Sequence, residues 1–98
     1  MPYIVVATPS YPSLSQFDEV IERIGEAPEG LLQRHVGTAA DGTLRIVTLW
    51  ESKADADRFL TSDRLGAAVA QVLGPEPAGT PDRVDIDVAR SFVREPVG

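Results

Sequence analysis

The segment from residue 44 to residue 50 restricts the possible folds most, because both of its faces are apolar. Side chains of an extended chain point alternately to opposite sides. One side would carry Leu44, Ile46, Thr48 and Trp50, and the other Arg45, Val47 and Leu49. Large apolar groups on both sides must be removed from water. The segment therefore predicts a central strand in a sheet that is covered on both faces.

Two helical regions are predicted, and each begins at a hydroxyl-bearing residue. Ser13 and Gln16 fit a capping box, and apolar residues then recur at helical spacing until Gly25. Ser52 opens a second, shorter helix, and the helical pattern restarts at Ser62. We therefore expect the second helical region to be divided in two.

Four β-rich or alternating segments predict strands, at residues 3–8, 31–37, 43–51 and 84–88. In the last of them Val84 and Ile86 are expected to face inward, with Asp85 and Asp87 on a solvated face. The segment 75–81 is rich in Pro, Gly and Ala and predicts a surface loop. The order β-α-β-β-α-β is the ferredoxin-like α+β arrangement, and 98 residues predict a single domain over residues 1–98.

The predicted fold leaves one apolar face of the sheet without a cover. In this order both helical regions pack on the same face, so Val36, Val47 and Leu49 would lie on the other face and contact water. Large exposed apolar patches usually mark interfaces. The sequence therefore predicts a homodimer in which a second sheet covers this face; the alternative is a monomer with an apolar sheet surface.

Composition excludes several functional classes. A net charge of −6 repels phosphate backbones and anionic membrane surfaces, so no nucleic-acid or membrane partner is expected. The chain has no cysteine and one histidine, which predicts no disulfide and no bound metal ion. Its apolar runs are far shorter than the roughly 20 residues that span a bilayer. A cytoplasmic location is expected.

The Asp41-Gly42 turn decides which side chains share the face of Trp50. A two-residue loop of type I′ would place Gln33 opposite Trp50 and His35 opposite Thr48, all on the helix-facing side. A loop with an odd number of residues would exchange the two faces of the strand at residues 31–37, because a one-residue shift in register turns every side chain to the opposite face. Arg34 and Val36 would then face the helices. The even loop is predicted, which leaves Arg34 on the other face.

Four residues are candidates for a site in the even register. His35 has an unperturbed pKa near neutrality, which suits a general acid or base; otherwise it is a structural residue. Trp50 can form an aromatic wall for a flat ligand, or it is plain core. Gln33 and Thr48 can bind a ligand oxygen or satisfy one another.

The segment from Gly30 to Phe59 resembles the antibiotic-biosynthesis-monooxygenase type of dimeric α+β barrel. The shared features are a strand, the Asp-Gly turn, the run from Leu44 to Trp50, and a Glu-Ser turn into a helix. Order and length match over nearly the whole chain. The resemblance implies a dimer. It also implies a pocket that includes Trp50, because the matching tryptophan of the phenol oxygenases belongs to their pocket. Phenol oxygenases of this type have an asparagine four residues earlier, where this chain has Ile46.

These observations lead to two functional hypotheses. The first is a small enzyme without cofactor, a monooxygenase or cyclase, which holds an aromatic or polyketide-like molecule between sheet and helices. In it His35 would exchange a proton and Trp50 would stack on the ring. Haem is not expected, because the haem-degrading relatives need a histidine on a helix and this chain has none there. The second hypothesis is a non-catalytic homodimer that binds a small molecule or a partner protein.

Overall fold

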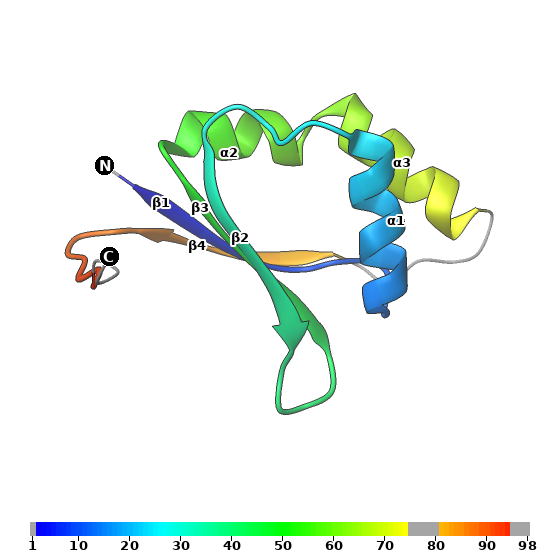
Figure 1. Ribbon diagram of the computed structural model, residues 1–98, viewed down its shortest axis with the longest axis horizontal. Coiled ribbons are helices and arrows are strands. Elements are labelled where there is room, and N and C mark those ends of the chain that lie inside the picture. The colour runs from blue at the N-terminus through cyan, green and yellow to red at the C-terminus, as the bar shows by residue number, and fades with distance from the viewer. Residues whose placement is uncertain (1, 75–80, 95–98) are drawn as a thin grey trace.

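The computed structural model describes residues 2–74 and 81–94 (Figure 1). The elements in chain order are β1 (Tyr3–Thr8), α1 (Leu14–Ile24), β2 (Leu31–Thr38), β3 (Leu44–Trp50), α2 (Lys53–Leu60), α3 (Asp63–Leu73) and β4 (Asp82–Asp87). Neighbouring strands are antiparallel in the order β2-β3-β1-β4. This is the predicted ferredoxin-like α+β fold, with the second helical region divided as expected. Of the loop predicted for 75–81, all but Pro81 lies outside the described residues.

Serine side chains fix the starts of all three described helices. Ser13 accepts a hydrogen bond from the backbone of Gln16, whose side chain bonds back to Ser13 and completes the capping box. Ser52 and Ser62 accept equivalent bonds at the starts of α2 and α3. Gly25 ends α1 in the left-handed region, with φ of 80°. The predicted helix boundaries therefore follow from local hydrogen bonds.

The helices lie together on one face of the sheet, and they cover it through two apolar clusters (Figure 1). Val20 and Ile24 of α1 pack with Ala68 of α3 in the first cluster. In the second, Trp50 of β3 packs beneath Ala56 of α2. The sheet and helices thus form two layers, with the core between them.

The hairpin between β2 and β3 differs from the predicted one by a single residue. The backbone N–H of Ala39 donates to the carbonyl of Thr43 over 2.8 Å, and that of Gly42 donates to the carbonyl of Ala39 over 2.9 Å. In this turn Gly42 alone has a positive φ, of 88°, whereas a type I′ turn needs a positive φ at Asp41 as well. Asp41 instead accepts bonds from the backbone N–H and hydroxyl of Thr43, at 3.0 and 2.6 Å. The predicted even loop is wrong, and the chain adopts the odd alternative.

The odd loop exchanges the two faces of β2. Arg34 lies opposite Thr48, and His35 lies opposite Val47. Arg34 therefore faces the helices with Thr48, and His35 faces away from them. The predicted pairing of His35 with Thr48, and the predicted outward position of Arg34, are both wrong.

A bulge interrupts the pairing of the same two strands nearer the start of β2. Leu31 lies opposite Trp50, whereas Gln33 lies opposite Leu49. The extra residue is Leu32, so Leu31 faces the helices and Gln33 faces away. The predicted pairing of Gln33 with Trp50 is wrong, because the odd loop shifts the register at Gln33 as it does at His35.

The sheet face turned away from the helices is apolar and open in the single chain. Val47, Val84 and Ile86 keep exposed fractions of 38%, 57% and 44%. In β4 the predicted orientation is reversed, because Asp85 pairs with Val5 and so shares the helix-facing side, which turns Val84 and Ile86 outward. β4 therefore adds apolar side chains to this outer face, whereas the predicted position of Val36 on it is wrong, because Val36 lies opposite Ile46 and packs against the cluster on the helix side.

Gly30, which precedes β2, should not tolerate a side chain. Its φ is 85°, and a Cβ atom there would lie 2.4 Å from the carboxyl carbon of Asp55 in α2. We expect Gly30→Ala to lower the free energy of unfolding by about 2–4 kcal/mol, through backbone strain and the clash. Urea unfolding measures the change. Gly37→Ala is the control, because a Cβ atom at Gly37 meets nothing within 4 Å; equal losses in both variants would contradict this packing.

Candidate functional site

A cavity of about 590 Å³ lies between the sheet and the helices. Its walls come from all four strands and all three helices of the described chain. They are mainly apolar, with Phe17, Leu31, Ile46, Trp50, Phe59 and Val69 among them. The polar side chains on the walls include Tyr11, Arg34 and Thr48. A mainly apolar hollow with a few polar groups is the usual composition of a small-molecule site.

Trp50 is fully buried, and a hydrogen-bonded chain fixes its orientation. The indole Nε1–H donates to the hydroxyl of Thr48 over 2.8 Å, and that hydroxyl donates to the carbonyl of Val5 over 3.2 Å. A buried N–H without a partner would cost about 1–3 kcal/mol. Trp50 and Thr48 both line the cavity, but the hydroxyl proton of Thr48 is already committed to β1. Thr48 therefore holds the indole ring in place.

Phe59 of α2 extends the aromatic wall that Trp50 begins. The two ring centroids are 5.7 Å apart, and the rings are tilted by 36°. This separation lies within the range that aromatic pairs favour. Phe59 keeps some accessible surface, whereas Trp50 is fully buried, so Phe59 is the ring that a flat ligand can contact and Trp50 packs against it.

His35 and Gln33 do not reach the cavity. They lie exposed on the outer face of the sheet, where His35 Nε2 is 3.3 Å from Gln33 Oε1. The roles predicted for them, proton exchange and ligand contact, required them to face the helices. The register of β2 puts the sheet between these two side chains and the cavity.

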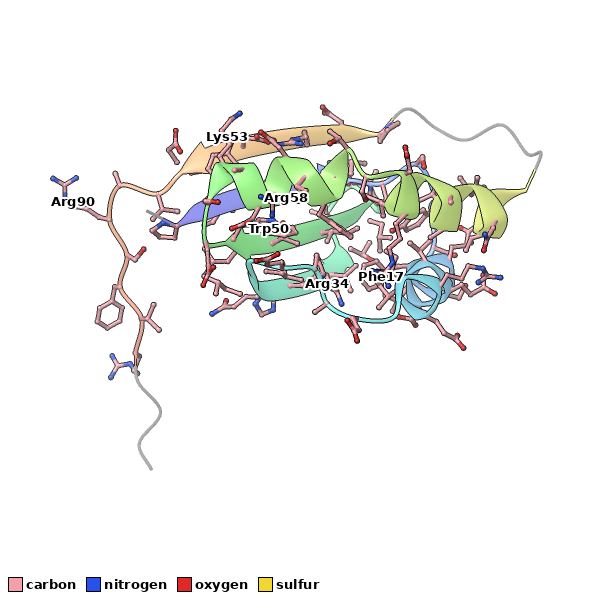
Figure 2. The ribbon with its side chains drawn as sticks, turned by 90° about the horizontal axis from the view of Figure 1, so that it is seen from above. Phe17, Arg34, Trp50, Lys53, Arg58 and Arg90 are labelled. Atoms are coloured by element: carbon pink, nitrogen blue, oxygen red, sulfur yellow. The ribbon has the colours of Figure 1, made fainter. Side chains whose placement is uncertain are left out.

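Arg34 lies on the cavity wall, where Gln33 and His35 were predicted to lie. Its guanidinium carbon lies 5.9 Å from the ring centroid of Phe17 in α1, a cation–π contact (Figure 2). No carboxylate of the described residues lies within ion-pair distance of it. A guanidinium is charged at every physiological pH. The cavity therefore contains a permanent positive charge.

Tyr11 brings a hydroxyl group into the same cavity from the loop between β1 and α1. Its side chain is 5% exposed and belongs to the cluster around α1 and α3. Burial raises the pKa of Tyr11 to about 12, against the smaller opposing effect of the positive charge on Arg34. The hydroxyl thus keeps its proton and remains a donor. Tyr11 and Arg34 both lie on the wall of the cavity.

At the edge formed by β4, by contrast, charges are neutralised within the chain. Arg83 lines the cavity and donates to Asp85 and to Asp57, at 2.5 and 3.0 Å. Asp85 also accepts a bond from the hydroxyl of Tyr3 over 2.5 Å. Hydrogen bonds from Arg83 hold the pKa of Asp85 down to about 2. This network connects β4 and β1 to α2. Its polar groups therefore stabilise the packing of these elements.

Sequence reasoning placed Arg34 on the other face of the sheet and assigned no role to Tyr11. The signal for Arg34 was the odd-loop alternative at Asp41-Gly42, which reverses the faces of β2. No periodic pattern pointed to Tyr11, because loop residues neither alternate as in a strand nor recur at helical spacing. Tyr11 enters the cavity through the path of the chain between β1 and α1.

Two further features are absent from residues 2–74 and 81–94. No group of three or more His, Cys, Asp or Glu side chains there is placed to hold a metal ion. No helix in those ranges is both long and apolar enough to cross a bilayer.

Solved structures share this fold over nearly the whole chain. A monooxygenase from the ActVA-Orf6 gene of Streptomyces coelicolor, determined with the ligand nanaomycin D, is 20% identical; the match covers 96% of this chain and 92% of that one, with a TM-score of 0.57. SnoaB, a cofactor-independent oxygenase from Streptomyces nogalater, is 10% identical in a mutant form, with coverages of 95% and 97% and a TM-score of 0.61. A dimeric ferredoxin-like protein of unknown function from Jannaschia sp. CCS1 is 14% identical, with coverages of 90% and 100% and a TM-score of 0.60.

These identities establish a common fold and nothing finer. No family model matches the sequence, and no curated protein sequence matches it either. In its structure the chain resembles the antibiotic-biosynthesis-monooxygenase type of protein, which is the resemblance predicted from the segment between Gly30 and Phe59.

The two tyrosines of the chain should ionise only at strongly alkaline pH. The hydrogen bond to Asp85 raises the pKa of Tyr3, and burial raises that of Tyr11, in each case to about 12. Both groups favour the folded state in full below pH 10, and this contribution falls as the pH rises from about 10 to about 12. Tyrosinate absorbance against pH measures the ionisation, and urea-unfolded protein is the control. A tyrosine that ionises near pH 10 in folded protein would contradict these placements.

Proposed function

We propose that this protein is a cofactor-independent monooxygenase that acts, as a homodimer, on an aromatic, polyketide-like phenol. The observation that carries the proposal is the cavity of about 590 Å³ whose wall includes the fixed indole of Trp50. Sites for small molecules commonly have volumes of about 300–1,000 Å³. A molecule of two or three fused rings fits this range. The fold shared with a cofactor-independent oxygenase supports the choice of chemistry.

The proposed reaction needs no reductant other than the substrate. A phenol with a free ring position reacts with O₂ to give a quinone and water. One oxygen atom forms the new carbonyl group, and the other leaves as water with the phenolic proton and the ring hydrogen. The substrate loses four electrons, and O₂ gains four. No external electron donor is required, which is consistent with the prediction that no cofactor is bound.

The chain's contribution is to hold the ring and to exclude water. Phe59, which packs against Trp50, offers an aromatic surface, and Ile46 belongs to the same apolar wall. Ile46 stands where the phenol oxygenases of this type have an asparagine, so no side-chain amide is present at that position. An apolar enclosure favours a reactive arrangement of the ring and O₂ and slows side reactions with water.

A binding protein without catalysis is the second candidate, and one feature of the site favours it. No histidine is among the described residues that line the cavity, because His35 lies on the outer face. A bound phenol would have to pass its proton to water.

Oxygen consumption separates the two candidates. With a panel of naphthols and anthrones under air, we expect the protein to consume one O₂ for each quinone formed, without added metal, flavin or reductant. Trp50→Phe should lower this rate by about tenfold or more, through loss of ring positioning. His35→Gln should leave it within about twofold, because His35 is outside the cavity. Binding of these compounds, measured by Trp50 fluorescence, with no O₂ uptake by any of them would support the binding protein instead.

The homodimer is proposed because the outer face of the sheet is apolar over three strands. On that face Val6 of β1 lies between Val47 of β3 and Val84 of β4, and Ile4 lies between Leu49 and Ile86. At about 25 cal/mol per Å² of apolar area, covering the face would contribute several kcal/mol per subunit. The dimeric state of a protein with the same fold supports this arrangement.

Sedimentation tests the dimer. The protein should sediment at micromolar concentration with about twice the 10.5 kDa mass of the chain. Leu49→Asp should give a monomer or an unfolded chain, because it would bury an unpaired charge in the interface. Ala54→Asp adds the same charge to an exposed position of α2 and should leave the dimer intact. A wild-type monomer at this concentration would rule out the proposed interface.

A further inference from the structure

We propose that Arg34 and Tyr11 form a subsite that binds an anionic oxygen, a carboxylate or a phenolate, on the aromatic molecule in the cavity. This inference rests on the function proposed above and adds the charge of the ligand to it. Both residues lie on the cavity wall, one on β2 and one on the loop before α1.

Three other arginines form ion pairs within the described part of the chain, whereas Arg34 does not. Arg45, Arg58 and Arg83 each pair with an aspartate. Arg34 has no such partner among the described residues, although its side chain is only partly exposed. A guanidinium that is partly removed from water is costly unless an anion or an acceptor compensates it. The ring of Phe17 offers its face to this cation but accepts none of its N–H bonds.

The donors of Arg34 and Tyr11 suit one negatively charged oxygen group. A guanidinium has five N–H donors in a planar fork, and it binds carboxylates and similar anions through charge-assisted bonds. Tyr11 is held in its neutral form, so its hydroxyl can donate as well. Tyr11 lies on the cavity wall, so its hydroxyl is available as a second donor for a ligand there.

The position of the subsite relative to the aromatic wall defines the ligand. Arg34 lies directly opposite Thr48, and the hydroxyl of Thr48 holds the indole of Trp50. Figure 2 shows Arg34 between Trp50 and Phe17. A ring that lies against Trp50 would thus direct a substituent oxygen toward Arg34, on the side of α1. The ligand class is an aromatic acid or an acidic phenol.

Three other polar side chains on the wall are already engaged within the chain. Thr48 donates its proton to the carbonyl of Val5. Ser62 donates to the carbonyl of Phe59 and accepts from the backbone of α3. Arg83 is engaged by two aspartates. The net charge of −6 disfavours anions at long range, so a ligand anion depends on the local charge of Arg34.

A matched pair of probes tests the subsite by calorimetry. 2-Naphthoate and 2-naphthamide have nearly the same shape, and only the first is charged. We expect wild-type protein to bind 2-naphthoate about tenfold or more tightly than 2-naphthamide. Arg34→Gln should abolish this preference and change the affinity for 2-naphthamide by less than about twofold. Arg58→Gln, on an exposed part of α2 away from the cavity, should keep the preference.

A phenol separates the two kinds of anionic oxygen. If the subsite stabilises a phenolate, bound 2-naphthol should ionise at a pH lower than free 2-naphthol by about one unit or more, measured by its absorbance. Tyr11→Phe should reduce this shift, and Arg34→Gln should abolish it. Should Arg34→Gln fail to fold, Arg34→Lys keeps the charge and should retain part of both effects. The preference for 2-naphthoate over 2-naphthamide and the ionisation of bound against free 2-naphthol can both be measured on wild-type protein alone.

The outcomes distinguish this inference from the proposed function. A preference for 2-naphthoate assigns the subsite to carboxylates, and a shift in naphthol ionisation assigns it to phenolates. Binding of 2-naphthamide and 2-naphthol with neither effect overturns the anionic subsite and leaves the proposed function standing. Absence of binding by all three naphthalenes overturns the subsite and the aromatic cavity on which the function rests.

Discussion

The three-residue turn that joins β2 to β3 is the constraint on which the cavity depends. Gly42 adopts the left-handed conformation, and Asp41 is held by the hydroxyl and backbone of Thr43, which keep the pKa of its carboxyl below the usual range. Because strand side chains alternate with a period of two, this turn decides whether Arg34 or His35 faces the helices. The cavity thereby receives the guanidinium of Arg34 in place of the imidazole of His35.

The two faces of the sheet have different properties because the helices cover only one of them. On that face the cluster around α1 and α3 and the cluster beneath α2 both contribute residues to the same hollow. The other face carries aliphatic side chains of β1, β3 and β4 and has no comparable cover among residues 2–74 and 81–94. In the proposed dimer a second copy covers the aliphatic face. The helix-facing side then remains available for a ligand.

Local signals made the fold predictable, whereas the site depends on distant or finely balanced contacts. Serine caps and apolar periodicity mark the helices, and alternation within β3 places Trp50 and Thr48 on one face whatever their partners are. The register of β2 was not predictable, because an Asp-Gly pair suits both two-residue and three-residue loops. The choice depends on the bonds between Asp41 and Thr43. The orientation of β4 was also missed, since a single sequence does not show that its aliphatic side chains lie on the open face.

The permanent charge of Arg34 gives the proposed chemistry a particular dependence on pH. A guanidinium stays protonated across the physiological range, and Tyr11 stays neutral there because burial raises its pKa to about 12. Neither group would change its protonation state during a reaction near neutral pH. The ionisation of the ligand would therefore control both its binding and its reactivity, with its proton released to water. An acidic phenol meets this demand, because Arg34 stabilises its anion and an electron-rich anion is the form that O₂ can oxidise.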